Sequence, residues 1–404
     1  MNKAEIAGCQ TLAELLHPVE VEGFLATTWG QNYLHVRSEN PSRFECLFPW
    51  DAVNAILEQH RLDPPRIRLA KESANIPAAS FITSFTDSRG SRINRVRPVD
   101  VQRHIEQGAT LVLDCVDELY RPLSQLAFGL EQLLGESIQI NAYLGAKALP
   151  GFETHWDTHD VLILQVFGNK NWRIFGMARK YALAGDAQLK DDIPAEPLWA
   201  GTLNPGDLLY IPRAWWHDAS ATGEPTLHLT IGISNATGQD FVNWIAGKLR
   251  ECEIVRRDLP RFMPEAAQNE HLSALRSAIS SALESYDLDA FFGERRNGID
   301  RRAHSALPWT LAPDRFDLED EQRVRFAFPE APDISVCKEG AKLRAKGNEW
   351  NLSREMAMLL RELSDGEWHC ISKLRTRSSS YLDAEIVSPL ILELLRQGLL
   401  ELER

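Results

Sequence analysis

The stretch THWDTHDVLILQVFGNKNWRIF, residues 154–175, places two histidines and two aspartates directly before an apolar run. That run is typical of a buried strand. His155 and Asp157 are two positions apart, and alternate side chains of an extended chain share one face. We therefore expect both groups on the same side of the chain, in a geometry that chelates a metal ion.

Two further segments alternate in the same way. Residues 137–144, SIQINAYL, and residues 226–234, TLHLTIGIS, each put apolar side chains on one face and polar side chains on the other. The polar faces hold Gln139, Asn141 and Tyr143 in the first segment and Thr226, His228 and Thr230 in the second. If these strands line one barrel, the polar faces converge on a single interior site with apolar walls. Short strands between turn signals, from about 110 to 235, predict a barrel or a sandwich.

A third metal ligand is offered by residues 203–219, LNPGDLLYIPRAWWHDA. A Pro-Gly-Asp turn and a short apolar strand lead there to His217. Two histidines and one carboxylate on one face form a facial triad, which holds iron(II) and leaves positions open for substrate and oxygen. A lone His-x-Asp is common by chance, but this combination is far more specific.

The open metal positions need a co-substrate, and Lys170 indicates its chemistry. Lys170 follows the turn FGNK and has the same parity as Trp172 and Ile174, so it can extend into the interior. A buried ammonium group is costly unless an anion meets it. A dicarboxylate that chelates iron at one end and meets Lys170 at the other satisfies both. The alternative is an exposed lysine in a hairpin.

Composition sets wider limits. The chain has 404 residues, with 44% hydrophobic and 25% charged residues, as in ordinary globular proteins. It has no apolar run of the roughly 20 residues that cross a membrane, and no secretory signal, so we expect a cytoplasmic protein. Six scattered cysteines predict reduced thiols. The net charge of -13 disfavours direct nucleic-acid binding and is compatible with a basic protein partner.

Four regions are expected along the chain. They are a mixed helical region at 1–110, a catalytic core at 111–235, a helical region at 236–304 and a small helical and stranded domain at 305–404.

Local signals predict helices at 49–60, from near Asp100 to Gly108, and before Gly135. The arginine-rich run at 85–97 is either a solvated loop or a contact for an acidic ligand or phosphate.

With these motifs the chain resembles the JmjC-type ribosomal oxygenases, a cupin-fold group that includes bacterial arginyl and human histidyl hydroxylases. Residues 22–37 are similar to the start of their fold, 155–175 to their metal and co-substrate strands, and 203–219 to the strand of their distal histidine. The resemblance implies a double-stranded β-helix core, a helical dimerisation region and a winged-helix-like tail. It also implies Fe(II) as cofactor, 2-oxoglutarate as co-substrate and a homodimer.

By position, the resemblance makes His155, Asp157 and His217 the iron ligands. Lys170 matches the basic partner of the distal carboxylate of 2-oxoglutarate, which is arginine in some members. Asn141, Tyr143 and Thr230 fall where the family places hydrogen bonds to that co-substrate.

Three positions need separate comment. Ala214 replaces a glycine that is common in the family before the distal histidine, and alanine is tolerated there unless the backbone needs a positive φ. His159 has the parity of the ligands and is a candidate either for contact with substrate or for support of the ligands from behind, although the motif does not require it. His228 is expected to be a packed, hydrogen-bonded interior residue, because His217 already supplies the third ligand.

The resulting expectation is an Fe(II)- and 2-oxoglutarate-dependent dioxygenase that hydroxylates a side chain of a protein substrate, with a ribosomal protein as the expected substrate. The sequence does not separate an arginine target from a histidine target. Two alternatives stay open: an oxygenase that modifies a small peptide or metabolite, and a non-catalytic metal-binding cupin with a regulatory role. Against nucleic-acid binding by the tail, residues 305–404 hold 14 Lys and Arg against 18 Asp and Glu, a net charge of -4.

Overall fold

The computed structural model describes residues 11–72, 74–148, 151–183, 185–186, 192–298, 305–312, 315, 317–327, 333–337, 340–345, 348–365 and 367–403. The chain divides into two compact units, one ending at Ser234 and the other beginning at Asn235. The finer division into four regions stays a prediction.

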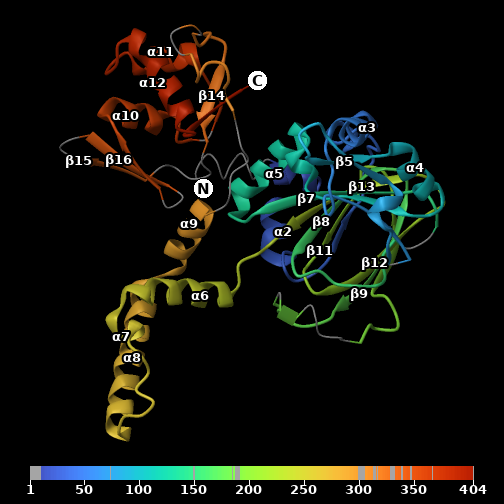
Figure 1. Cartoon of the computed structure of the whole chain (residues 1–404), viewed down its shortest axis with the longest axis horizontal. Helices are drawn as coiled ribbons and strands as arrows, with labels where there is room; N and C mark the ends of the chain where they lie inside the picture. Colours follow the sequence, from blue (N-terminus) through green and yellow to red (C-terminus); the bar gives the residue numbers. More distant parts are fainter. Residues whose placement is uncertain are drawn as a thin grey trace. The chain divides into compact units, whose positions relative to one another are not determined.

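The first unit contains a larger and a smaller β-sheet, besides one two-stranded hairpin (Figure 1). The larger sheet has the strand order β1-β11-β8-β13-β7-β6-β2-β3 and the smaller sheet the order β10-β9-β12. The larger sheet consists of β1 (Leu34–Val36), β2 (Ile67–Lys71), β3 (Ala74–Asn75), β6 (Thr110–Leu113), β7 (Ile138–Gly145), β8 (Asp160–Phe167), β11 (Leu208–Ile211) and β13 (Thr226–Ile233). The smaller sheet consists of β9 (Lys170–Met177), β10 (Trp199–Leu203) and β12 (Trp215–Ala221). The two antiparallel sheets form the expected β-barrel core.

Strand β8 explains why the apolar run is continuous. Leu162 and Leu164 belong to the large core that the eight-stranded sheet shares with helices. Val161 and Ile163 belong to a second cluster, with Trp172 and other residues of the smaller sheet. Both faces of β8 are therefore buried, which confirms the buried strand predicted from the sequence.

The helices of the first unit agree with the sequence signals. They are α2 (Val21–Thr27), α3 (Trp50–Gln59), α4 (Pro98–Glu106) and α5 (Arg121–Leu134), with 3₁₀ turns η1 (Glu45–Leu47), η2 (Ala78–Ser80) and η3 (Val116–Glu118). Helix α5 ends at Gly135, whose φ of 64° suits glycine. Helix α4 begins at Pro98, slightly before the predicted start near Asp100, because proline is well suited to the first helical turn.

The arginine-rich run at 85–97 lies largely in a β-hairpin. Strands β4 (Ile82–Thr86) and β5 (Arg92–Val96) pair antiparallel. Arg97, at the end of the run, forms an ion pair with Asp100 of α4. The prediction of a solvated loop was therefore incomplete, because the segment is largely exposed but its residues pair in two strands.

The second unit begins with helices, as predicted. They are α6 (Gly238–Lys248), η5 (Leu249–Glu251), α7 (Glu253–Arg256), α8 (Glu265–Ser285) and α9 (Leu288–Gly298). The remaining elements are β14 (Arg323–Phe326), β15 (Asp333–Cys337), β16 (Gly340–Ala345), β17 (Asn348–Leu352), α10 (Arg354–Glu362), β18 (His369–Cys370), α11 (Ile371–Ser378), α12 (Ala384–Arg396) and β19 (Leu400–Leu402). These last elements form two three-stranded sheets, and a separate apolar core holds them together with their helices. Among the described helices of the whole chain, none has the length and apolar character needed to cross a membrane.

Candidate metal centre

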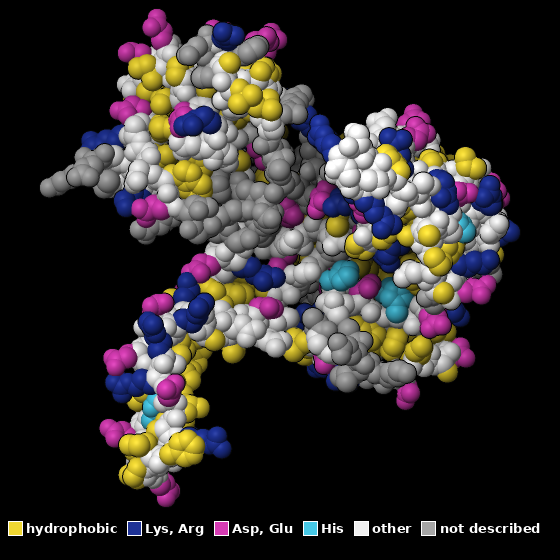
Figure 2. Space-filling model, viewed as in Figure 1, with side chains coloured by type: hydrophobic (Ala, Val, Ile, Leu, Met, Phe, Trp, Pro, Cys, Tyr) yellow, Lys and Arg dark blue, Asp and Glu magenta, His cyan; other side chains and the backbone are white. Residues whose placement is uncertain are grey.

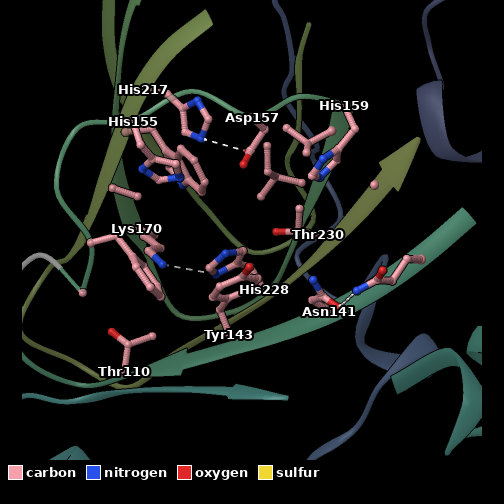
Figure 3. Close-up of a pocket in the computed structure, with 18 of the residues that line it drawn as sticks. Thr110, Asn141, Tyr143, His155, Asp157, His159, Lys170, His217, His228 and Thr230 are labelled. Atoms are coloured by element: carbon pink, nitrogen blue, oxygen red, sulfur yellow. Dashed lines mark hydrogen bonds and ion pairs between the residues drawn. The ribbon is translucent and has the colours of Figure 1, made fainter. Parts of the chain in front are cut away.

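Three of the predicted site residues converge inside the barrel. The ligand atoms of His155, Asp157 and His217 lie within 4.8 Å of one another. The backbones of His155 and His217 form an antiparallel bridge, with N–H to O distances of 3.0 and 2.8 Å. Their rings lie with centroids 4.6 Å apart, and His217 Nε2 lies 3.5 Å from an Asp157 carboxylate oxygen (Figure 3).

Each histidine ring is oriented by its backbone neighbourhood. His155 Nδ1 lies 2.8 Å from the carbonyl oxygen of Glu153, and His217 Nδ1 lies 2.9 Å from that of Trp215. A carbonyl only accepts hydrogen bonds, so Nδ1 carries the proton in both rings. Each Nε2 is therefore left with a lone pair for a metal ion.

Electrostatics favour the metal-binding form of His217. Burial, followed by the nearby His155, lowers the pKa of His217, while Asp157 opposes this shift. The ring is therefore neutral near pH 7. A neutral imidazole is the form that binds metal ions, so burial prepares this ligand.

The structure corrects the expected local geometry of the first two ligands. Strand β8 begins at Asp160, so His155 and Asp157 precede it and do not lie on a regular strand. The bridge to His217 positions His155. Asp157 is tied at its backbone, where its carbonyl oxygen accepts a hydrogen bond of 2.8 Å from the N–H of Ala214.

Ala214 itself requires a second correction. Its φ is +63°, in the left-handed region that glycine occupies at least cost. The backbone therefore does need a positive φ where the family commonly has glycine. The alanine keeps the contact to Asp157 and adopts a conformation that is unfavourable for a residue with a Cβ atom.

The three side chains open into a cavity of about 270 Å³. Its lining includes all seven predicted site residues, namely Asn141, Tyr143, His155, Asp157, Lys170, His217 and Thr230. The volume exceeds that of several water molecules, each with a share of about 30 Å³ in the liquid. The cavity therefore has room for a small organic molecule beside the candidate metal ligands.

Lys170 lies in this cavity with only 9% of its surface exposed. Its Nζ is 3.4 Å from His228 Nδ1, and 6.0 and 5.7 Å from the ring centroids of Tyr143 and Trp172. Among the described residues, no carboxylate forms an ion pair with it, and burial is the only cause that shifts its pKa. Burial lowers the pKa of Lys170 to about 7. An anion placed next to the ammonium group would reverse that shift.

The other predicted co-substrate residues offer neutral polar groups. Asn141 Oδ1 accepts hydrogen bonds of 3.0 Å from the backbone N–H of Cys115 and from Gln139 Nε2, which fixes the amide. Burial, the largest cause, raises the pKa of Tyr143 to about 12, so its phenol keeps its proton. Thr230 lies on the same strand as His228 and lines the cavity (Figure 3).

His159 also lines the cavity, beside the backbone of Gly232. A Cβ atom at position 232 would lie 2.9 Å from His159 Cδ2, so the glycine makes room for the ring. His228 is a buried interior residue, as expected, and it contacts Lys170.

Sequence reasoning missed two features of the cavity. Arg68 on β2 lines the cavity, and no sequence pattern marks this arginine. Its guanidinium group forms a bidentate ion pair with the Asp114 carboxylate, with hydrogen bonds of 2.8 and 2.9 Å. Trp172 has the predicted parity, but its buried Nε1–H has no hydrogen-bond partner among the described residues. An unpaired buried donor is costly, and no described residue offsets the cost at this N–H.

Comparison with known proteins shows which proteins this chain is similar to. Residues 119–241 match the JmjC domain. The chain is 27% identical over 333 residues to the bifunctional lysine-specific demethylase and histidyl-hydroxylase NO66 of Drosophila persimilis, covering 77% of this chain and 46% of that protein. It is 26% identical over 267 residues to ribosomal oxygenase 1 of Bos taurus, covering 64% and 39%. The chain thus spans less than half the length of these relatives.

Solved structures show the same fold. The Escherichia coli ribosomal oxygenase YcfD, in complex with cobalt and 2-oxoglutarate, aligns with a TM-score of 0.56 and 16% identity over 96% of this chain and 99% of that one. The alignment extends beyond the barrel to nearly the whole chain, including the helical and C-terminal regions. Together with the match over residues 119–241, it shows that this chain contains a JmjC domain and is similar to the ribosomal oxygenases.

Proposed function

We propose that the protein is an Fe(II)- and 2-oxoglutarate-dependent oxygenase that hydroxylates a side chain of a protein substrate. The observation that carries this proposal is the convergence of His155, Asp157 and His217 at one end of a cavity that holds the buried Lys170. The named relatives, a histidyl-hydroxylase and a ribosomal oxygenase, support it.

The donor set fits iron(II). Two imidazole nitrogens and one carboxylate oxygen on one face are the ligands of non-haem Fe(II) oxygenases, and they leave coordination positions free. The orientation of both Nδ1–H groups toward backbone carbonyls supplies the outer contacts that such ligands normally have. When bound here, iron(II) supplies the oxygen-dependent chemistry that converts 2-oxoglutarate to succinate and CO2 and a C–H bond to an alcohol.

The cavity also fits a dicarboxylate. Lys170 provides a positive charge in a buried wall. A carboxylate accepts hydrogen bonds from an ammonium group. The distal carboxylate of 2-oxoglutarate would therefore meet Lys170, and the neutral groups of Asn141, Tyr143 and Thr230 would provide polar contacts along the molecule.

The chain's own residues bind, orient and exclude water. His155, Asp157 and His217 would hold the metal, and Lys170 would set the direction of the co-substrate. The apolar walls of the barrel, which include Val161 and Ile163, limit access of water. No side chain is required as a general base, because the reaction breaks a C–H bond by oxidation.

The central experiment measures succinate formed from 2-oxoglutarate by purified protein with Fe(II). Basic ribosomal proteins serve as candidate substrates, and mass spectrometry detects one added oxygen atom and its position. Turnover and hydroxylation that disappear in His155→Ala and Asp157→Ala support the proposal. Turnover that persists in these variants contradicts the metal assignment.

The same experiment separates the alternatives. Turnover with a small peptide or metabolite, but with none of the ribosomal proteins, would favour the tailoring oxygenase. Stoichiometric iron without succinate formation would favour a non-catalytic metal-binding cupin. The ribosomal protein is preferred because the relatives named as ribosomal oxygenases extend along most of this chain.

We also propose that the protein forms a homodimer through the helical segment 238–298. This segment exposes large apolar side chains, including Leu259 at 72% and Phe262 at 91%, and Figure 2 shows hydrophobic side chains gathered along it. A contiguous exposed apolar surface is typical of a protein interface.

Light scattering after gel filtration should give twice the monomer mass. The double variant Leu259→Asp with Phe262→Asp should reduce the measured mass to that of one chain. The control variant Leu198→Asp, at an exposed leucine of the first unit, should leave the mass unchanged.

A further inference from the structure

Lys170 and His228 form a buried contact between two groups that can each carry a positive charge. Lys170 Nζ and His228 Nδ1 are 3.4 Å apart, and the two residues are 9% and 2% exposed. Two positive charges in a buried contact repel each other strongly. At most one of the two groups is therefore charged.

The charge belongs on Lys170. Burial, and then the charge of Lys170, lower the pKa of His228 well below its usual value, so this ring is neutral. A neutral imidazole has one nitrogen that accepts a hydrogen bond, whereas an ammonium group only donates. His228 Nδ1 is therefore the acceptor for Lys170, and the ring proton lies on Nε2.

Neighbouring strands fix the position of this acceptor. His228 on β13 lies directly opposite Tyr143 on β7 in the sheet register. The two rings stack with centroids 4.9 Å apart and an interplanar angle of 10°. The His228 ring is also nearly perpendicular to the Trp172 ring, with centroids 5.7 Å apart and an interplanar angle of 85°. The imidazole is thus held on two sides.

Lys170 has no comparable support of its own. A lysine side chain has four flexible methylene groups and a point-like charge. The contact with His228 is the only hydrogen bond of Lys170 Nζ to another described residue (Figure 3). The rings of Tyr143 and Trp172 lie farther away, at 6.0 and 5.7 Å from Nζ, and impose no direction as strict as a hydrogen bond.

We propose that His228 is a positioning residue for the co-substrate: its Nδ1 accepts a hydrogen bond from Lys170 and holds the ammonium group where the distal carboxylate of a dicarboxylate meets it. This inference rests on the proposed function. It differs from a packing role because it requires an acceptor atom at position 228, whereas packing requires only a ring.

The test compares three variants by calorimetric binding of 2-oxoglutarate to manganese(II)-loaded protein. His228→Phe keeps a ring on Tyr143 and removes the acceptor. His228→Gln restores a side chain that can accept a hydrogen bond. The matched control is Thr226→Val, on the same strand and face, which loses a buried 2.8 Å hydrogen bond from Gln165 but has no hydrogen bond to Lys170. Metal content and thermal unfolding are measured for every variant.

We expect His228→Phe to weaken 2-oxoglutarate binding about tenfold, because hydrogen bonds to charged groups are among the stronger ones. Its manganese content should be unchanged. His228→Gln should recover most of the affinity, and Thr226→Val should bind like the wild type even though it unfolds at a lower temperature. If His228→Phe does not fold, His228→Leu provides the same comparison.

Unchanged affinity in His228→Phe overturns the inference and leaves the proposed function intact. Equal losses in the Phe and Gln variants also overturn it, because they show that the shape of histidine matters and the acceptor does not. Wild-type protein that binds manganese but no 2-oxoglutarate overturns the proposed function together with the inference.

Discussion

The buried lysine predicts that the affinity for 2-oxoglutarate falls as pH rises above 7. Burial lowers the pKa of Lys170 to about 7 in the free protein. A carboxylate bound beside the ammonium group favours the charged form and raises this pKa. Above pH 7, binding therefore requires the uptake of one proton, and the apparent affinity decreases by up to a factor of about 10 per pH unit.

The size of the effect follows from the charged fraction. With a pKa of about 7, Lys170 is half charged at pH 7, and roughly 3% is charged at pH 8.5. The dissociation constant should therefore rise about 15-fold between these two values. The burial-lowered pKa of His217 keeps that ligand neutral across this range, so its protonation does not interfere.

Calorimetric titration of manganese(II)-loaded protein with 2-oxoglutarate measures this change directly. Repeating the titration in buffers of different ionisation enthalpy counts the protons taken up. Lys170→Arg is the matched control, because arginine stays charged throughout and should give a nearly flat profile. A wild-type dissociation constant that is the same at pH 7 and pH 8.5, with constant metal content, would refute the reasoning.

Three further predictions concern stability and metal binding. Lys170→Met should raise the free energy of unfolding at pH 7 by on the order of 4 kcal/mol, because folding lowers the pKa of Lys170 from 10.5 to about 7 and each pKa unit corresponds to about 1.4 kcal/mol. The destabilisation by the buried lysine is fully present below pH 7 and fades as pH rises toward 10.5. Urea titrations that show no gain in stability at pH 7 would contradict the burial of a charged lysine. Asp157→Ala should retain less than roughly a tenth of the wild-type iron, because it removes the only carboxylate of the triad. Mass spectrometry of metals after dialysis measures the iron content. Full iron content in the variant would exclude Asp157 as a ligand. Ala214→Val should lower the free energy of unfolding by about 1–3 kcal/mol, because a β-branched residue is strained at a φ of +63°. The control, Ala214→Gly, should fold normally. Equal stability of the wild type and both variants in urea would show that the loop adapts at no cost.

Much of the site could be predicted because its elements follow the strict period of β-strands. Parity placed Lys170 and Trp172 on one face of β9, and Lys170 and Trp172 are both buried in the cavity wall. The same reasoning succeeded for Tyr143 and Thr230, which line the cavity from β7 and β13. In each case, hydrogen bonding between neighbouring strands fixes which side chains point inward.

Sequence reasoning failed where tertiary contacts override the local pattern. His155 and Asp157 are oriented by a bridge and a backbone hydrogen bond to a distant segment, and a strand period does not describe them. Ala214, whose N–H donates to Asp157, has a positive φ, and only the comparison with the family's glycine, not the alanine itself, pointed to this. Arg68 reaches the cavity from a strand whose sequence shows no functional pattern.

The cavity concentrates features that lower the stability of the folded chain. It contains a buried ammonium group without a carboxylate partner among the described residues, and a buried indole N–H without a hydrogen bond. The backbone next to the distal histidine has an unfavourable φ at Ala214. Hydrophobic residues at positions 170 and 172 would fold with less conflict, so packing alone does not account for these side chains. A bound dianion would place a negative charge beside the buried ammonium group. The same side chains that weaken the free protein would therefore make its stability depend on the ligand, and 2-oxoglutarate should stabilise the wild type but not Lys170→Met.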